Sequence, residues 1–177
     1  MKLEFKEFSF ETFKEEMTKL KDEKHFDYLV TIIGEDFGKE EGLGCIYLLE
    51  NTETHERISI KQMAKQVGDD YVIPSLYYVW RAADLLEREV YDFFGIKFLG
   101  HPDMRRLFLR TDFVGYPLRK DYDMSPEHNQ FPMTDEPETD WTSEWSLNDL
   151  GELVEKKHRL FQPDDYVINF GPNHPST

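Results

Sequence analysis

The sequence predicts an α+β fold, in which a small, mostly antiparallel or mixed sheet carries helices packed mainly on one face. Apolar and β-branched runs recur between residues 26 and 79 with short polar turns between them, which is typical of antiparallel strands. Two stretches, at residues 9–20 and 80–95, instead show the helical spacing of apolar residues. Beyond residue 122 the composition becomes acidic, and we expect an extended C-terminal tail with one short helix there.

The first half of the chain begins with a short amphipathic helix, since Phe10, Phe13, Met17 and Leu20 are three or four residues apart. Four extended runs follow, at residues 26–36, 43–51, 56–64 and 71–79. Pro74 lies in the fourth run and predicts an edge position or a bulge, because proline has no N–H to donate to a neighbouring strand.

The second helix, at residues 80–95, should bury one apolar stripe and end at Gly95. The stripe consists of Ala82, Leu85, Leu86, Val90 and Phe93. Glu89 is spaced to point toward it and therefore needs a partner, for which Arg105 and Arg106 are candidates. Glu87 should face solvent or a neighbour. Asp84, Arg88 and Asp92 should lie on the opposite, polar side, where Arg88 and Asp92 have the spacing of a surface ion pair.

The chain divides into three parts by composition. Residues 1–122 form the α+β domain. Residues 123–165 form an acidic linker with a helix near 146–161, because residues 123–155 hold ten acidic residues and no Lys or Arg. Residues 166–177 form a closing extended segment.

Composition excludes several classes of function. A net charge of −15 argues against general nucleic-acid binding, which needs a basic face. No run approaches the roughly 20 apolar residues of a membrane span, so we expect membrane contact only through partners. The single cysteine, Cys45, cannot supply the four thiolates of an iron–sulfur cluster, and no histidine pair has helical ligand spacing. We assign no catalytic, cofactor-binding or metal-binding residue to this chain.

Two features leave functional alternatives open. Glu87 and Glu89 suggest acid–base catalysis, but residues two apart on a helix face different directions, so a stand-alone hydrolase is the weakest interpretation. Residues 97–122 hold six basic and three acidic residues between glycines and prolines, which predicts a loop of fixed shape. Its arginines either face an acidic partner protein or pair within the chain. A free-standing acidic binding module is a further alternative.

The stretch EREVYDFFGIKFLGHPDMRRLFLRTDFVGYPLRKDY closely resembles the signature region of the C subunit of respiratory complex I, the proton-pumping NADH:quinone oxidoreductase. The similarity extends more loosely over residues 26–122. Leu85 departs from the pattern, since the family often has Trp there. The matching residues are Glu87, Arg88, Glu89, Asp92, Gly95, Ile96, Phe98, Gly100, His101, Pro102, Arg105, Arg106, Gly115, Pro117, Leu118, Arg119, Lys120 and Asp121.

A second resemblance lies at the C-terminus, where INFGPNHPST is similar to the opening of the D subunit of the same complex. Together they imply the first part of a C–D fusion, with residues 123–165 as its linker and 166–177 as the start of the D-like part. The resemblance implies a protein without a redox centre, in a complex that uses FMN, iron–sulfur clusters, NADH and quinone.

The family further implies a peripheral position on the cytoplasmic side of the bacterial inner membrane, against the cluster-bearing subunits and the D subunit. Residues 87–121 would be the docking surface, and charge reversal at Arg105 or Arg119 should weaken assembly. The equivalent subunit of a membrane-bound hydrogenase or another complex I-like enzyme is the alternative.

Overall fold

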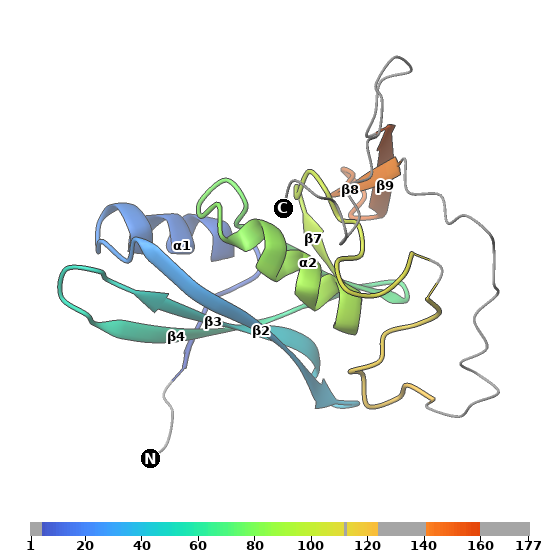
Figure 1. Ribbon diagram of the computed structural model, residues 1–177, viewed down its shortest axis with the longest axis horizontal. Coiled ribbons are helices and arrows are strands. Elements are labelled where there is room, and N and C mark those ends of the chain that lie inside the picture. The colour runs from blue at the N-terminus through green and yellow to red at the C-terminus, as the bar shows by residue number, and fades with distance from the viewer. Residues whose placement is uncertain (1–4, 112, 124–140, 160–177) are drawn as a thin grey trace, which may run out of the picture.

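The computed structural model describes residues 5–111, 113–123 and 141–159, and these residues form two helices and two mixed sheets (Figure 1). The predicted α+β class is confirmed. The expectation of one small sheet is wrong, because the chain leaves the first sheet after residue 63 and builds a second. The segment that resembles the D subunit, at residues 166–177, and residues 124–140 of the acidic linker lie outside the described residues.

The first sheet contains three of the predicted strands. Its order is β1 (Lys6–Glu7), β4 (Arg57–Met63), β3 (Gly42–Glu50) and β2 (Tyr28–Gly38). β2, β3 and β4 form an antiparallel meander, and β1 pairs parallel to β4. Alternate side chains of β3 are buried, among them Cys45, Tyr47 and Leu49. The period-two pattern of a half-buried strand thus holds where the sequence predicts it.

The second sheet has the order β5 (Lys65–Val67), β6 (Asp70–Pro74), β7 (Ile96–Leu99), β8 (Trp141–Leu147) and β9 (Leu153–Arg159). β6 and β7 are parallel, and the helix between them makes the crossover that parallel strands require. Pro74 is at the end of β6, beyond the last residue that β5 pairs, Val72. The position is therefore locally an edge, as proline predicts.

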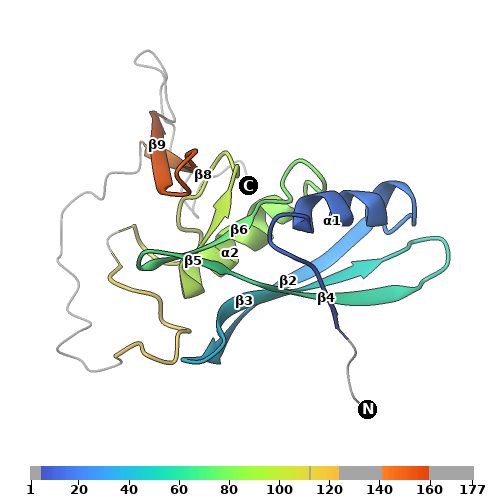
Figure 2. The same cartoon turned by 180° about the vertical axis from the view of Figure 1, so that it is seen from behind.

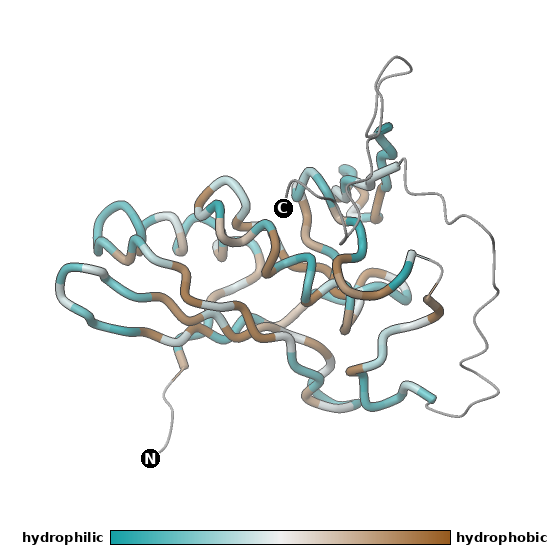
Figure 3. Tube along the Cα trace, in the orientation of Figure 1, coloured by the Kyte–Doolittle hydropathy of each residue, from teal (hydrophilic) through white to brown (hydrophobic). Residues whose placement is uncertain are grey.

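Both helices, α1 (Phe13–Asp22) and α2 (Ala83–Phe94), lie on the same face of the first sheet (Figures 1 and 2). Phe13 of α1 packs against Tyr47 of β3, with ring centres 5.2 Å apart. The hydropathy of the trace follows this core: apolar segments run along β2, β3 and α2, whereas β8 and β9 are mostly hydrophilic (Figure 3). Helices that cover one face of a sheet bury the apolar stripes of both, as the predicted architecture requires.

The predicted helix at residues 146–161 is wrong over the residues that the structure describes. β8 and β9 form an antiparallel hairpin there, with register Trp145↔Glu155. Asn148 makes the turn: its side-chain oxygen accepts the N–H groups of Leu150 and Glu152, at 3.0 and 2.8 Å. Gly151 has φ +76°, which glycine adopts easily. Turn chemistry therefore prevailed over the apparent helical spacing of the leucines.

Candidate functional site

The signature residues gather around α2 and the loop of residues 100–119 that follows β7. The loop crosses the outside of α2 and returns to the C-terminal end of that helix, as Figure 1 shows. Two acidic side chains of α2, Glu87 and Asp92, are fully buried. The two carboxyl groups have different hydrogen-bond partners, and together they fix the orientation of α2.

Glu87 points into the core from the middle of α2. Its carboxylate accepts hydrogen bonds from the Ser75 hydroxyl at 2.6 Å and from the Leu76 N–H at 2.7 Å. Burial raises the pKa of Glu87 to about 8, although these two hydrogen bonds act in the opposite direction. The predicted orientation is wrong: Glu89 is exposed and Glu87 is the inward residue.

The buried stripe of α2 differs from the predicted one because the helix is rotated. Ala83, Glu87 and Val90 face inward, at the spacing of one helix face. Leu85, expected in the core, is 56% exposed. The apolar residues alone allow either rotation, and the donors of Ser75 and Leu76 favour the one that places the Glu87 carboxyl group inside.

Asp92 holds the loop against the C-terminal half of α2. Its Oδ2 accepts the backbone N–H groups of Leu107, Phe108 and Leu109 at 3.1, 2.7 and 2.9 Å. Its Oδ1 lies 2.9 Å from Nη1 of Arg106. The prediction that Asp92 lies on the polar surface and pairs with Arg88 is therefore wrong.

Arg106 connects α2 to both ends of the loop. Besides the Asp92 carboxylate, its guanidinium donates to the carbonyl oxygens of Asp92, Phe113 and Gly115 at 2.9, 3.1 and 2.9 Å. Arginine suits this place because its rigid fork of donors can serve several acceptors at once. Arg106 is thus paired within the chain, with Asp92 and not with Glu89.

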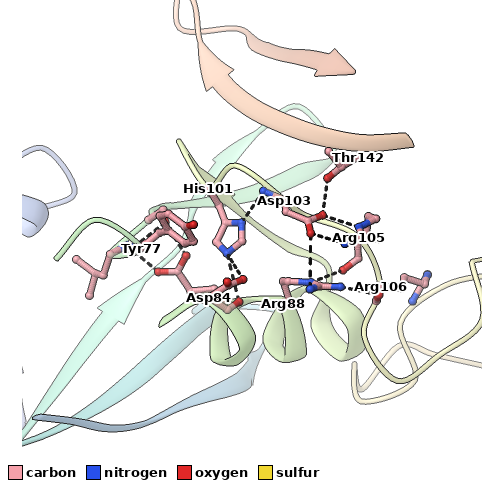
Figure 4. A network of polar contacts seen from close by, with 11 residues as sticks. Tyr77, Asp84, Arg88, His101, Asp103, Arg105, Arg106 and Thr142 are labelled. Atoms are coloured by element: carbon pink, nitrogen blue, oxygen red, sulfur yellow. Dashed lines mark hydrogen bonds and ion pairs between the residues drawn. The ribbon is translucent and has the colours of Figure 1, made fainter. Parts of the chain in front are cut away.

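A second network surrounds His101, which is fully buried (Figure 4). Its Nδ1 accepts the N–H of Asp103 at 3.0 Å. Its Nε2 therefore carries the proton and donates to the carbonyl oxygen of Asp84, 3.2 Å away. Burial lowers the pKa of His101, so the ring is neutral near pH 7. The histidine serves as a fixed bridge between the loop and the first turn of α2.

Asp103 is the centre of the same network. Arg105 binds its carboxylate with two donors, Nε at 2.7 Å and Nη2 at 2.6 Å, and the Thr142 hydroxyl donates at 2.5 Å (Figure 4). Burial acts to raise the pKa of Asp103, but the hydrogen bonds from Arg105 and Thr142 outweigh it and hold the pKa well below its usual range. Through Thr142 the network also attaches β8 to the domain.

Arg88, expected on the polar side of α2 with the spacing of a surface pair with Asp92, instead reaches the loop. Its Nε and Nη2 donate to the carbonyl oxygens of Arg105 and Arg106 at 3.1 and 3.3 Å, and its Nη1 lies 3.7 Å from Asp103. The structure thus brings Arg88, His101 and Arg105 together in one network and Asp92 and Arg106 in another.

The side chains of the other signature residues lie apart from these networks, although the carbonyl oxygen of Gly115 accepts from Arg106. Gly95 and Arg119 are at the end of α2, Gly115 packs beside Tyr122, and Pro102 and Pro117 are half-buried. Glu89, Lys120 and Asp121 are exposed.

Sequence reasoning missed Ser75, Asp103 and Thr142 and misplaced Asp84. The position of Asp103 between His101 and Arg105 was a signal that could have identified it. Thr142 is in the expected linker, and nothing in the sequence indicates its contact with Asp103.

The outer side of α2 presents exposed apolar residues beside an acidic one, next to the loop. Leu85, Glu89 and Phe93 follow one another at four-residue spacing, and Phe108 of the loop stacks on Phe93 with ring centres 5.7 Å apart. Leu85 is 56% exposed and Phe108 64%. We call Leu85, Glu89 and Phe108 the outer stripe.

The described part of the chain has neither a grouped set of metal ligands nor a helix suited to span a membrane. No three His, Cys, Asp or Glu side chains are grouped there as metal ligands. Neither of its two helices has the length and apolar character that crossing a membrane requires.

These observations define a small α+β domain whose charged signature residues mainly hold its own loop in place. Comparison with known proteins then gives the family. The profile described as "Respiratory-chain NADH dehydrogenase, 30 Kd subunit" matches residues 7–128. The chain belongs to this family, which confirms the resemblance to the C subunit of complex I.

C and C/D subunits of bacterial NADH-quinone oxidoreductases are similar to most of this chain. The fused C/D subunit of the NADH-quinone oxidoreductase of Phocaeicola vulgatus is 48% identical over 167 residues, which cover 94% of this chain and 31% of the relative. The C subunit of the NADH-quinone oxidoreductase of Moorella thermoacetica is 36% identical, over 63% of this chain and 74% of that protein. The chain therefore spans about a third of the length of the C/D relatives it matches.

Solved structures show the same fold. The trypsin-resistant fragment (1–134) of Nqo5 is 33% identical with a TM-score of 0.50, over 55% of this chain and 79% of that one. A chain of the membrane-bound sulfane sulfur reductase, described as an archaeal respiratory membrane complex, is 27% identical with a TM-score of 0.60. That match covers 70% of this chain and 75% of the other.

Proposed function

We propose that this chain acts as the C part of an NADH:quinone oxidoreductase of the complex I type, joined to a D-like part. The family match and the names of the C/D relatives support this assignment. In the proposal the whole complex transfers electrons from NADH to quinone and couples this to proton translocation. The chain would sit peripherally on the cytoplasmic side of the bacterial inner membrane and reach the membrane through its partners.

The role of this chain in the complex would be docking. The observation that carries this is the contrast between the buried signature residues and the outer stripe. Asp92, His101 and Arg106 are used to fix the loop of residues 100–119 against α2. Side chains held in this way give a surface of fixed shape, and exposed large apolar residues beside polar ones are typical of protein–protein contacts.

The outer stripe would be the centre of that contact, and the exposed signature residues Lys120 and Asp121 directly follow the loop. Apolar side chains that are exposed alone and buried in a complex supply much of the energy of association. FMN and the iron–sulfur clusters would be held by other subunits. A chain whose sequence contains one cysteine lacks the thiolates that such clusters use.

A second candidate function is the equivalent role in another respiratory membrane complex. The likeness to a chain of the sulfane sulfur reductase, with a TM-score of 0.60, favours it. The two candidates share the docking role and differ in the electron donor and acceptor.

The test is purification of the native complex through a tag on this chain after gentle solubilisation of membranes. We expect flavin- and cluster-bearing subunits by mass spectrometry, a polypeptide that includes a D-like sequence, and NADH-dependent quinone reduction. Recovery with sulfur reductase or hydrogenase subunits would establish the second candidate instead. Recovery of the chain alone from the soluble fraction would refute both.

A further inference from the structure

A cavity of about 490 Å³ lies where the tip of the β2–β3 hairpin meets residues 119–121, at the end of the loop that follows β7. The two segments lie side by side in both ribbon views (Figures 1 and 2), and the Lys120 N–H donates to Asp36 at 2.8 Å across their junction. The residues of the lining that matter are Asp36, Lys39, Tyr71, Arg119, Lys120 and Asp121. The volume suits one or two side chains of another protein better than a large cofactor.

Arg119 is fixed in the wall of this cavity. Its Nε donates to the carbonyl oxygen of Phe94 at 2.5 Å, which caps the C-terminal end of α2. The guanidinium carbon lies 4.7 Å from the ring centre of Tyr116 and 5.6 Å from that of Tyr71. Gly95 makes room for this arrangement, because a Cβ there would lie 2.6 Å from Nη2 of Arg119.

The capping role uses only one edge of the guanidinium. No described residue accepts a hydrogen bond from either terminal nitrogen of Arg119. Two N–H₂ groups with a fixed orientation are the donors that arginine uses to bind a carboxylate with two parallel hydrogen bonds. Because packing has already ordered the side chain, little further entropy is lost when such a ligand binds.

The charges around the cavity also favour an acidic ligand. Lys39, Arg119 and Lys120 are three cations against the two carboxylates of Asp36 and Asp121. Asp36 is already committed, since its oxygens accept the N–H groups of Gly38 and Lys120, both at 2.8 Å. This local excess of positive charge lies in a chain of net charge −15.

The position of the site selects among acidic ligands. The negative end of the α2 dipole is beside Arg119, whereas phosphate sites typically use the positive, N-terminal end of a helix. A singly charged carboxylate is therefore better suited than a phosphate dianion.

We propose that this cavity receives an Asp or Glu side chain of a partner protein, whose carboxylate pairs with the terminal nitrogens of Arg119. The proposal rests on the docking function above and adds the chemistry of one contact to it. A second copy of this chain fits the site poorly, because two chains of the same large net charge repel each other.

The experiment is zero-length cross-linking of the purified complex with a water-soluble carbodiimide, which joins an ammonium to a carboxylate in contact with it. We expect Lys39 or Lys120 to be joined to an acidic residue of another protein of the complex. In complexes carrying Arg119→Gln we expect that cross-linked peptide to decrease at least about tenfold, since a desolvated charge pair is broken. Arg119→Lys keeps the positive charge but not the fork, and should give an intermediate yield.

The outcomes separate this inference from the function on which it rests. An intact complex with cross-links elsewhere, but none from Lys39 or Lys120, overturns the inference and leaves the docking function standing. Cross-links from these lysines to acidic residues within 123–155 of the same chain also overturn it, because the chain's own linker would be the ligand. If no complex is recovered with the wild-type chain, the proposed function fails and the inference with it.

Discussion

Replacing Asp92 by Asn should show how strongly the buried networks hold the loop. Asp92 is fully buried and accepts four side-chain hydrogen bonds, three from backbone N–H groups and one from Arg106. Asn has nearly the same shape, but one of its two terminal groups is a donor. The NH₂ group must then face either the three backbone N–H groups or the guanidinium.

The orientation in which the NH₂ group faces the Arg106 guanidinium should cost less, because it keeps the three hydrogen bonds from backbone N–H groups. It leaves Arg106, whose side chain is 12% exposed, without its anion. Breaking a buried pair by removing one partner costs about 3–5 kcal/mol. Arg106 keeps its carbonyl acceptors, so we expect the lower end, about 3 kcal/mol of the free energy of unfolding.

The assay is urea denaturation of the 177-residue chain, followed by tryptophan fluorescence. Asp69→Asn is the matched control, because Asp69 is exposed and in no ion pair with another described residue. The control should change stability by no more than about 0.5 kcal/mol. If Asp92→Asn were as mild as the control, the networks would not be what fixes the loop, and the reasoning above would be refuted.

Two further predictions concern the core and the end of α2. The pKa of Glu87 is about 8 in the folded chain and about 4.5 in the unfolded chain. Between these pH values the folded state binds more protons than the unfolded state. The free energy of unfolding therefore decreases as pH rises through this range. Glu87→Gln should remove this dependence, and its urea midpoint should rise relative to wild type between about pH 5 and about pH 8; parallel profiles would contradict the assignment. Gly95→Ala should destabilise the chain by clearly more than Gly68→Ala. Both glycines have positive φ, +71° and +62°, but only at Gly95 would a Cβ meet another side chain, 2.4 Å from Tyr116. Equal losses in thermal unfolding would show that packing at Gly95 contributes nothing.

The sequence identified three of the four strands of the first sheet, β2, β3 and β4, and both helices, because their apolar periodicity is strong. The two-residue strand β1 was not predicted. The sequence did not determine the rotation of α2. Leu85 and Leu86 look like core residues, and only the donors of Ser75 and Leu76 explain why Glu87 is inside instead. That information comes from a segment brought near by the fold, and local spacing cannot contain it.

The second sheet was missed for a related reason. β7 follows α2 directly and depends on pairing with β6, a contact that no local pattern announces. The β8–β9 hairpin was misread as a helix because Leu147, Leu150 and Val154 have helical spacing. Asn148 and Gly151 are typical turn residues, and they are a stronger signal than the helical spacing of three apolar residues.

The signature itself was found from sequence, but its residues were given the wrong surroundings. Arg105 and Arg106 were candidate partners of Glu89, and the structure pairs them with Asp103 and Asp92 instead. The docking surface is accordingly expected at the outer stripe, which the buried pairs support from beneath.

The most direct test of this account compares two exposed leucines in the assembled complex. Leu85, in the outer stripe, is 56% exposed, and Leu150, in the β8–β9 turn, is 82% exposed. Each is changed to Lys, the chain is confirmed to unfold at the wild-type urea midpoint, and the amount of complex recovered through its tag is measured. We expect Leu85→Lys to lose most of the complex and Leu150→Lys to keep it. Normal recovery with Leu85→Lys would contradict the claim that the outer stripe is the docking surface.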